Sequence, residues 1–172
     1  MIIIHGVQKL LNTSRLKPAL YISEPSPNQY LHSWYARLLA TGAPGKLLVL
    51  YVHQPSLMTI ICKGKTIQGT WAQFLERLPL LLDRFHFQKE FIEHEMQEMN
   101  GYIVSRTNSK SILAFMNQMV PILDHQIYRA GTYDEISLQW LEDLMMKFPH
   151  KHKESHDYFS PLQFWEETIK SK

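Results

Sequence analysis

Two adjacent segments rich in β-branched and aromatic residues constrain the fold most strongly. Residues 46–54 contain the run LLVLYVH, and residues 56–63 contain the run LMTIICK. Such runs are typical of buried strands. The step from Pro55 to Ser56 between them leaves room only for a short connection. We therefore expect two neighbouring strands joined by a hairpin or a similarly tight turn.

The remaining strands and helices follow from the spacing of apolar residues. Two further apolar runs, at 2–5 and 102–105, are expected to be strands. Helical spacing, with apolar residues every three or four positions, indicates helices at 30–41, 71–85, 87–100, 109–128 and 136–145. Asn28 and Thr70 are expected N-caps, as is Thr132 or Asp134 for the helix at 136–145. Pro79 predicts a kink or break, and Pro121 a bend.

Four strands and about five helices in this order indicate the α+β class. We expect a small, mainly antiparallel or mixed four-stranded sheet that packs against the helices. The 172 residues and the apolar content of 45% suit one domain whose core is large enough to fold alone. We find no repeat or linker, and we expect a single domain over 1–172. The polar stretch at 149–160 is expected to be a surface loop.

Charge and cysteine content narrow the classes of function. Eighteen basic residues nearly balance sixteen acidic ones, and the formal net charge is +2. The composition therefore gives no sign of the concentrated basic face that is typical of nucleic-acid-binding proteins. The only cysteine is Cys62, which excludes an intrachain disulfide and favours a reducing compartment. Its apolar surroundings predict a buried structural thiol. No signal peptide or membrane span is visible, so we expect a soluble, cytoplasmic protein.

The most distinctive local feature is the junction at 106–111, where a predicted strand leads into a polar turn and a helix. Its residues are Arg106, Thr107, Asn108, Ser109, Lys110 and Ser111. The free amides and positive dipole end of a helix bind anions, and these side chains add donors and charge. A phosphate or carboxylate ligand fits this chemistry, although the glycine-rich P-loop pattern is absent. A capped helix, with Thr107, Asn108 or Ser109 as the N-cap, explains the same residues.

The expected helix at 30–41 carries a second group of candidate residues, Trp34, Tyr35 and Arg37. Neighbours on a helix lie about 100° apart, so one aromatic ring is expected in the core and the other at the border of a cleft. There, aromatic rings and an arginine could stack a base or another ring. Asn117 is a further candidate for the border of this cleft. Core packing with a surface arginine is the alternative interpretation.

Two histidine-containing stretches are candidate metal sites, and each has a simpler explanation. His86, Glu90 and His94 would share one helix face, but they lack the spacing of zinc hydrolases, so a solvated charged face is favoured. The tract with His150, Lys151, His152, Lys153 and His156 is expected to be part of the surface loop. No nucleophile elbow, dinucleotide fingerprint, paired-cysteine zinc site or kinase motif is present. We therefore expect no metal and no cofactor.

Three blocks of residues carry a resemblance to a known family. They are Met1-Ile2-Ile3 with Lys9-Leu10-Leu11, then Trp34-Tyr35-Ala36-x-Leu38-Leu39, then Thr107-Asn108-x-x-Ser111-Ile112-Leu113-x-x-Met116-Asn117. In order and approximate spacing the chain resembles domain of unknown function 6933, a family of bacterial proteins. The family pattern often has Arg where this chain has Lys110 and Gly where it has Ala114. The resemblance implies a small intracellular bacterial protein and assigns no activity.

Three functions are compatible with the sequence. The absence of catalytic motifs favours a non-enzymatic binding or interaction domain, which would bind a protein partner or form a homodimer. The alternative is an enzyme or ligand-binding domain for a phosphorylated or nucleotide-like compound at 106–111. The third is a nucleic-acid-linked role in defence or in a toxin–antitoxin pair, and the weak basic balance argues against it.

Overall fold

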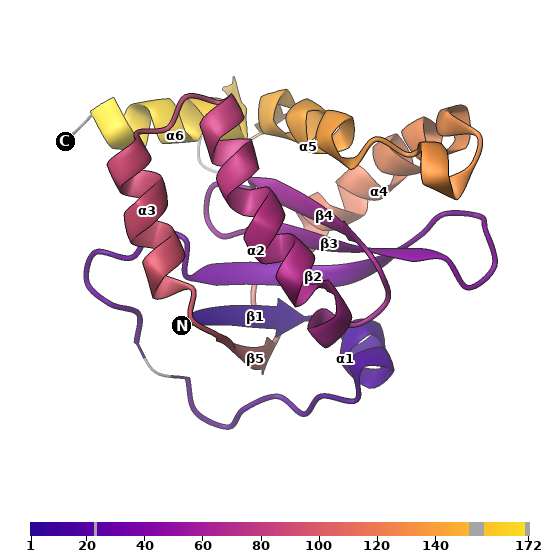
Figure 1. Cartoon of the computed structure of the whole chain (residues 1–172), viewed down its shortest axis with the longest axis horizontal. Coiled ribbons are helices and arrows are strands. Elements are labelled where there is room, and N and C mark those ends of the chain that lie inside the picture. The colour runs from indigo at the N-terminus through magenta and orange to yellow at the C-terminus, as the bar shows by residue number, and fades with distance from the viewer. Residues whose placement is uncertain (23, 152–156, 171–172) are drawn as a thin grey trace.

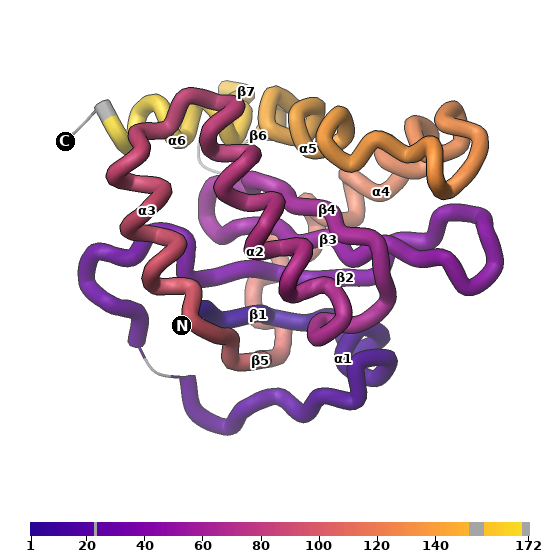
Figure 2. The backbone as a smooth tube through the Cα atoms, in the orientation of Figure 1, coloured from indigo at the N-terminus to yellow at the C-terminus, as the bar shows by residue number. Residues whose placement is uncertain are grey.

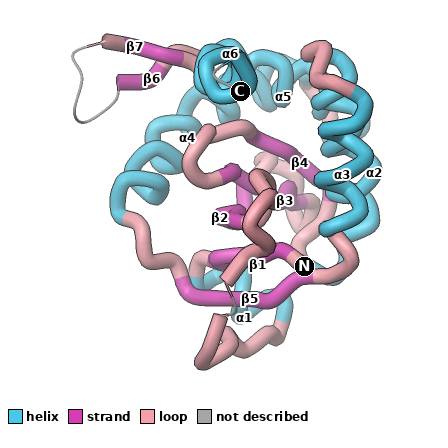
Figure 3. The backbone as a smooth tube through the Cα atoms, turned by 90° about the vertical axis from the view of Figure 1, so that its left-hand side faces the viewer, coloured by secondary structure: helices cyan, strands magenta, loops and turns pink. Residues whose placement is uncertain are grey.

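Helices flank both faces of a five-stranded sheet (Figure 1), and a two-stranded hairpin lies apart from it (Figure 3). The computed structural model describes residues 1–22, 24–151 and 157–170. The sheet contains β1 (Ile2–Gly6), β2 (Ser33–Ala40), β3 (Leu47–His53), β4 (Thr59–Lys63) and β5 (Tyr102–Arg106), and the hairpin contains β6 (His150–Lys151) and β7 (Tyr158–Phe159). The helices are α1 (Gln8–Ser14), α2 (Ile67–Arg84), α3 (Lys89–Glu98), α4 (Lys110–Ala130), α5 (Leu138–Lys147), α6 (Pro161–Lys170) and the 3-10 helix η1 (Tyr133–Glu135).

The sheet is mixed, with the strand order β4-β3-β2-β1-β5. β1 pairs in parallel with β2 and with β5, whereas β3 pairs antiparallel with both β2 and β4. β3 and β4 are the tightly connected strand pair that the sequence predicts. The α+β class is confirmed, but the sheet has five strands where four were predicted, and six α-helices are described where about five were expected.

The additional strand is β2, and the predicted helix at 30–41 is wrong. Trp34 pairs with His53 on β3 and with Ile4 on β1, so β2 lies between two other strands. Both faces of such a strand are buried, and its sequence therefore need not alternate between apolar and polar residues. Apolar pairs such as Leu38 and Leu39 then imitate helical spacing. Successive strand residues point to opposite faces, which separates Trp34 from Tyr35.

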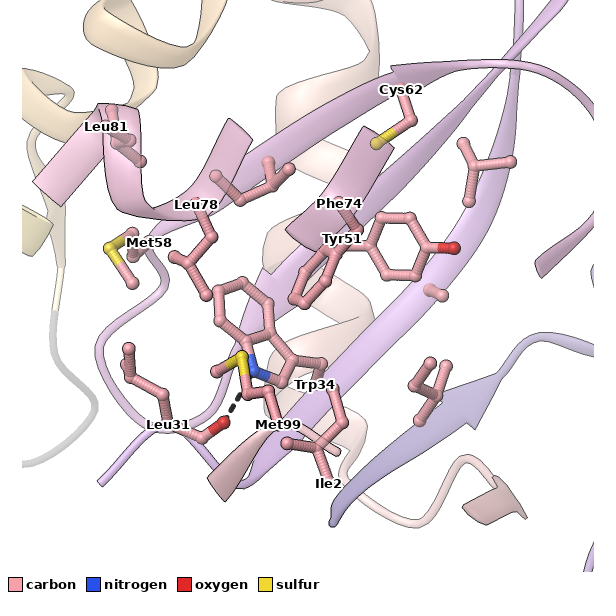
Figure 4. Close-up of a cluster of buried hydrophobic side chains, with 14 of the residues drawn as sticks. Ile2, Leu31, Trp34, Tyr51, Met58, Cys62, Phe74, Leu78, Leu81 and Met99 are labelled. Carbon is pink, nitrogen blue, oxygen red and sulfur yellow. Dashed lines mark hydrogen bonds between the residues drawn. The ribbon is translucent and has the colours of Figure 1, made fainter. Parts of the chain in front are cut away.

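The first hydrophobic core lies on the sheet face covered by α2 and α3, called here the α2 face (Figure 3). Its centre is aromatic, because the rings of Trp34 and Tyr51 each lie 4.9 Å from that of Phe74. Trp34 Nε1 donates a hydrogen bond of 2.9 Å to the carbonyl oxygen of Leu31 (Figure 4). This bond satisfies the one polar atom of a fully buried indole. Cys62 is buried in the same core, as the sequence predicts.

The second core lies on the opposite face, called here the α4 face, which α4 and α5 cover. Tyr35 and Leu50 from the sheet meet Met116 and Met119 from α4 and Leu141 from α5. Most of the strand residues on this face are apolar, but β1 and the start of β2 contribute His5 and Ser33, which are also buried. A polar cluster therefore adjoins the second core.

The helices predicted at 71–85, 87–100, 109–128 and 136–145 are present as α2 to α5, with ends that differ from the prediction by up to four residues. Three expected caps are wrong. Asn28 precedes strand β2 and no helix. α2 begins after Thr66, whose side chain accepts a hydrogen bond from the amide of Gly69, and Thr70 lies inside the helix. Ser137 caps α5 through the amide of Trp140, whereas the expected cap Thr132 precedes η1. α2 continues past Pro79 without a break, and α4 likewise continues past Pro121.

Both edges of the sheet are partly covered. At β4, the Glu142 carboxylate accepts from the amide of Ile61 at 3.0 Å, and the Gln73 amide bonds both backbone groups of Lys63. At β5, Ala19 donates to the carbonyl of Val104 at 2.8 Å, where the segment between α1 and β2 passes the strand (Figure 2). Such coverage reduces the unpaired backbone groups that would favour edge-to-edge association.

Candidate functional site

A pocket of about 420 Å³ lies where α4, the β3–β4 connection and the β6–β7 hairpin meet, and we call it the α4 pocket. It is lined by Gln54, Pro55, Leu57, Ser111, Ile112, Ala114, Phe115, Gln118, His150, Lys151 and Phe159. Small-molecule sites usually measure about 300–1,000 Å³ and combine an apolar wall with a few polar groups. The α4 pocket has this size and composition.

The walls of the α4 pocket differ in chemistry. Leu57, Ile112 and Phe115 are buried and make an apolar floor. The ring of His150 lies 5.1 Å from that of Phe115 in an edge-on arrangement and 4.5 Å from that of Phe159 in a tilted one, and these rings close one side of the pocket. None of the lining residues described in the structure is acidic.

The polar lining comes mainly from two elements. Ser111 and Gln118 are exposed on the side of α4 that faces the pocket, and Lys151 is exposed on β6. Ser111 lies in the first turn of α4, where free amides and the helix dipole favour a negative group. The pocket therefore combines an apolar floor with a rim that favours an anion.

The candidate residues at 106–111 divide into a helix cap and exposed side chains. Ser109 Oγ accepts a hydrogen bond from the amide of Ile112 at 3.3 Å, which confirms the capped-helix interpretation, and it lies 3.0 Å from Ser111 Oγ. Arg106 and Lys110 are exposed, and Thr107 is half-buried. Ser111 lies in the α4 pocket. Anion binding by the whole turn stays a prediction.

The structure brings three of the four expected cleft-border residues to one side of the sheet. Tyr35 and Arg37 are two apart on β2 and share the α4 face. The Tyr35 hydroxyl donates to Asn108 Oδ1, and Arg37 Nη1 donates to Asn117 Oδ1 at 2.8 Å. These two bonds attach α4 and the turn before it to β2. Trp34 points into the core of the α2 face and does not share a site with them.

A histidine–serine pair beside Tyr35 was not predicted. His5 Nδ1 lies 3.1 Å from the carbonyl oxygen of Arg106, and His5 Nε2 lies 3.2 Å from Ser33 Oγ. The imidazole stacks on the Tyr35 ring at 4.6 Å, and Ser33 Oγ lies 3.4 Å from Gln54 Oε1. Burial lowers the pKa of His5, so the ring is neutral at neutral pH.

Sequence separation explains why the pair was missed. His5 and Ser33 are 28 residues apart, and Arg106 lies 101 residues from His5. The only local indication is a histidine within the apolar run at the start of the chain. It does not show which residue that histidine contacts. Parallel pairing of β1 with both β2 and β5 brings the three residues together.

A smaller pocket of about 160 Å³ lies at the other end of β1 and β5. It is lined by Met1, Ile2, Ile3, Glu24, Pro25, Ser26, Gln29, His32 and Ile103. His32 directly precedes Ser33, and Gln54, which contacts Ser33, lines the α4 pocket. His5 and Ser33 line neither of these two pockets, but Ser33 contacts the α4 pocket lining through Gln54.

Among the described residues, no group of three His, Cys, Asp or Glu side chains is arranged to hold a metal. His86 lies in a turn with φ 61° before α3 begins, away from the helix that carries Glu90 and His94. His150 is buried in β6, while His152, Lys153 and His156 fall outside the described residues. No described helix has the length and apolarity needed to cross a bilayer.

Fold and site together define a mixed α+β domain in which a polar cluster adjoins a pocket. The chain belongs to the family Domain of unknown function (DUF6933), whose model matches residues 3–164. The resemblance carried by the three sequence blocks is therefore confirmed. No curated protein matches the chain.

Proposed function

We propose that the protein is a ligand-binding domain that holds a small acidic compound with an apolar body in the α4 pocket. The observation that carries the proposal is the composition of the lining: an apolar floor, no acidic residue among those described, and a lysine and a helix start at the rim. Leu57, Ile112 and Phe115 would contact the apolar body, which gains from leaving water.

The acidic group of the ligand would lie between Lys151 and the first turn of α4. A charge-assisted hydrogen bond from an ammonium is stronger than a neutral one. Ser111 adds a hydroxyl donor at the same rim, and Gln118 adds a side-chain amide two turns further along α4. A phosphate or a carboxylate satisfies these donors equally. A nucleotide-like phosphate and an aromatic carboxylate are therefore the two ligand types to test.

The test is calorimetric titration with AMP, with indole-3-acetate and with inorganic phosphate. We expect one of the two ring compounds to bind more tightly than phosphate alone, because only it also reaches the apolar floor. Lys151→Gln should weaken that binding about tenfold, the effect of one charge-assisted hydrogen bond. Ala114→Trp should abolish it, since the indole would fill the pocket from an exposed helical position.

Lys110→Gln is the matched control, because Lys110 lies at the start of α4 but outside the pocket lining. It should leave the affinity within about twofold, as expected of an exposed lysine that makes no contact with the ligand. If Lys110→Gln weakens binding and Lys151→Gln does not, the ligand lies at the 106–111 turn and the proposal for the α4 pocket is wrong. Failure of both ring compounds to bind more tightly than phosphate contradicts it as well.

A further inference from the structure

The histidine–serine pair has a fixed proton arrangement. A backbone carbonyl only accepts hydrogen bonds, so the contact with Arg106 places the proton of neutral His5 on Nδ1. Nε2 then carries a lone pair and must accept a hydrogen bond from the Ser33 hydroxyl. Ser33 has one proton, so its longer contact with Gln54 Oε1 is not satisfied at the same time. The result is a hydroxyl directed at the lone pair of an oriented imidazole.

This is the arrangement of a nucleophile and its general base. In such sites a third group orients the base, and here the Arg106 carbonyl and the stacked Tyr35 ring hold the imidazole. Recognition of such a pair depends on geometry and roles rather than on sequence motifs. The sequence lacks a nucleophile elbow, and here the nucleophile, the base and the carbonyl that orients the base come from β2, β1 and β5.

A second histidine–serine pair in the same protein shows what wiring alone means. His53 Nε2 lies 3.0 Å from the carbonyl oxygen of Tyr30, and His53 Nδ1 lies 2.7 Å from Ser56 Oγ. Both residues of this pair are fully buried, at 0% exposure. Ser33 and His5 differ because they retain 8% and 5% exposure. This residual exposure, together with the contact from Ser33 to the pocket-lining Gln54, distinguishes the pair from His53 and Ser56.

We propose that Ser33 and His5 are the nucleophile and general base for hydrolysis of small acyl esters. Ser33 Oγ attacks the ester carbonyl carbon while its proton passes to His5 Nε2, and the alcohol leaves with that proton as its C–O bond breaks. Water then attacks the acyl-Ser33 and releases the acid, with the proton returning through His5 to Ser33 Oγ. The net reaction is ester plus water to acid plus alcohol.

The acidic part of the ester would occupy the α4 pocket, and this placement alone rests on the proposed function. Gln54 supports it, because the same side chain lines the pocket and contacts Ser33. The reaction itself depends only on Ser33, His5 and their surroundings. A reagent too small to need the pocket therefore tests the pair separately from ligand binding.

The experiment exposes the full chain to diisopropyl fluorophosphate, which forms a bond from serine oxygen to phosphorus and releases fluoride and a proton. Intact-mass and peptide mass spectrometry then count and locate the adduct. We expect one adduct, on Ser33, with none on Ser56. Ser33→Ala should remove the adduct. His5→Gln should slow its formation at least about 100-fold, the usual lower range for loss of a general base.

Each outcome decides the proposal. One adduct on Ser33 that depends on His5, together with release of p-nitrophenol from p-nitrophenyl acetate that is lost in Ser33→Ala, supports it. An unmodified protein, an adduct on another residue, or an equal rate of adduct formation in His5→Gln overturns it. The first two results are obtained with the wild-type protein and do not depend on whether a variant folds. Labelling of Ser33 without AMP or indole-3-acetate binding leaves the reaction standing and removes only the pocket assignment.

Discussion

Glu142 and Asp143 are neighbouring carboxylates on α5 that have very different surroundings. The Glu142 side chain has 0% exposure; Arg77 bonds it bidentately at 2.8 and 2.9 Å, and it accepts the amide of Ile61. The Asp143 side chain keeps 32% exposure and pairs with Arg84 at 2.9 Å. Burial makes Glu142 depend on its partners, because a charge without water needs other compensation.

The two carboxylates should therefore respond differently to neutralisation. Glu142→Gln leaves the Arg77 guanidinium without a carboxylate and should lower the free energy of unfolding by about 3 kcal/mol, as for other broken buried pairs. Asp143→Asn should lower it by less than about 1 kcal/mol, because water screens an exposed pair. Urea denaturation followed by circular dichroism measures both. Equal losses would show that Glu142 is not held by a charge pair.

At the scale of single elements, predictability from the sequence depended on whether a pattern was local. α4 could be predicted almost to the residue, because its cap Ser109 and its apolar stripe lie within one segment. β2 could not, because its strand character comes from β1 and β3 on either side of it. An apolar segment such as 33–40 fits either a buried helix or a buried strand, and only its neighbours decide.

The attachment of α4 to β2 is an element-scale interaction that can be measured. Arg37 Nη1 donates to Asn117 Oδ1, whereas Gln118 on the same helix turn lines the α4 pocket. A double-mutant cycle of Arg37→Met and Asn117→Ala should give a coupling energy of about 0.5–1.5 kcal/mol. The cycle of Arg37→Met with Gln118→Ala should give a coupling near zero. A coupling near zero in both cycles would mean that the bond does not hold α4 on the sheet.

For the whole molecule, the class of fold followed from composition and order of segments, but the buried polar contacts did not. Glu95 accepts the amide of Leu31 across 64 residues, and Glu142 accepts that of Ile61 across 81. Each carboxylate lies on a helix and accepts a hydrogen bond from a backbone amide outside that helix. Helical periodicity alone therefore predicts both as surface residues. For the same reason, the contact between His5 and Ser33 could not be predicted from the sequence. Polar residues acquire these roles only once distant elements are in place.

Buried histidines make the stability of the whole molecule depend on pH. Burial lowers the pKa of His53 to about 3, and the pKa of the same side chain in the unfolded chain is about 6.5. Between these values the unfolded chain binds a proton that the folded protein does not, so stability falls as the pH falls. His5 shifts in the same direction. Burial raises the pKa of Glu95 and Glu142, and such acids act in the opposite direction.

A difference between variants isolates the contribution of His53 from these other groups. From pH 7 to pH 5, His53 alone should remove about 2 kcal/mol from the free energy of unfolding, at about 1.4 kcal/mol per pH unit below its unfolded pKa. His53→Gln should therefore show a pH 7-to-5 loss that is smaller than that of the wild type by this amount, even though it is less stable at both values. His125→Gln, a change on the exposed side of α4, should keep the wild-type loss. Urea denaturation at the two pH values decides the matter: the same loss in all three proteins would mean that His53 takes up its proton without unfolding.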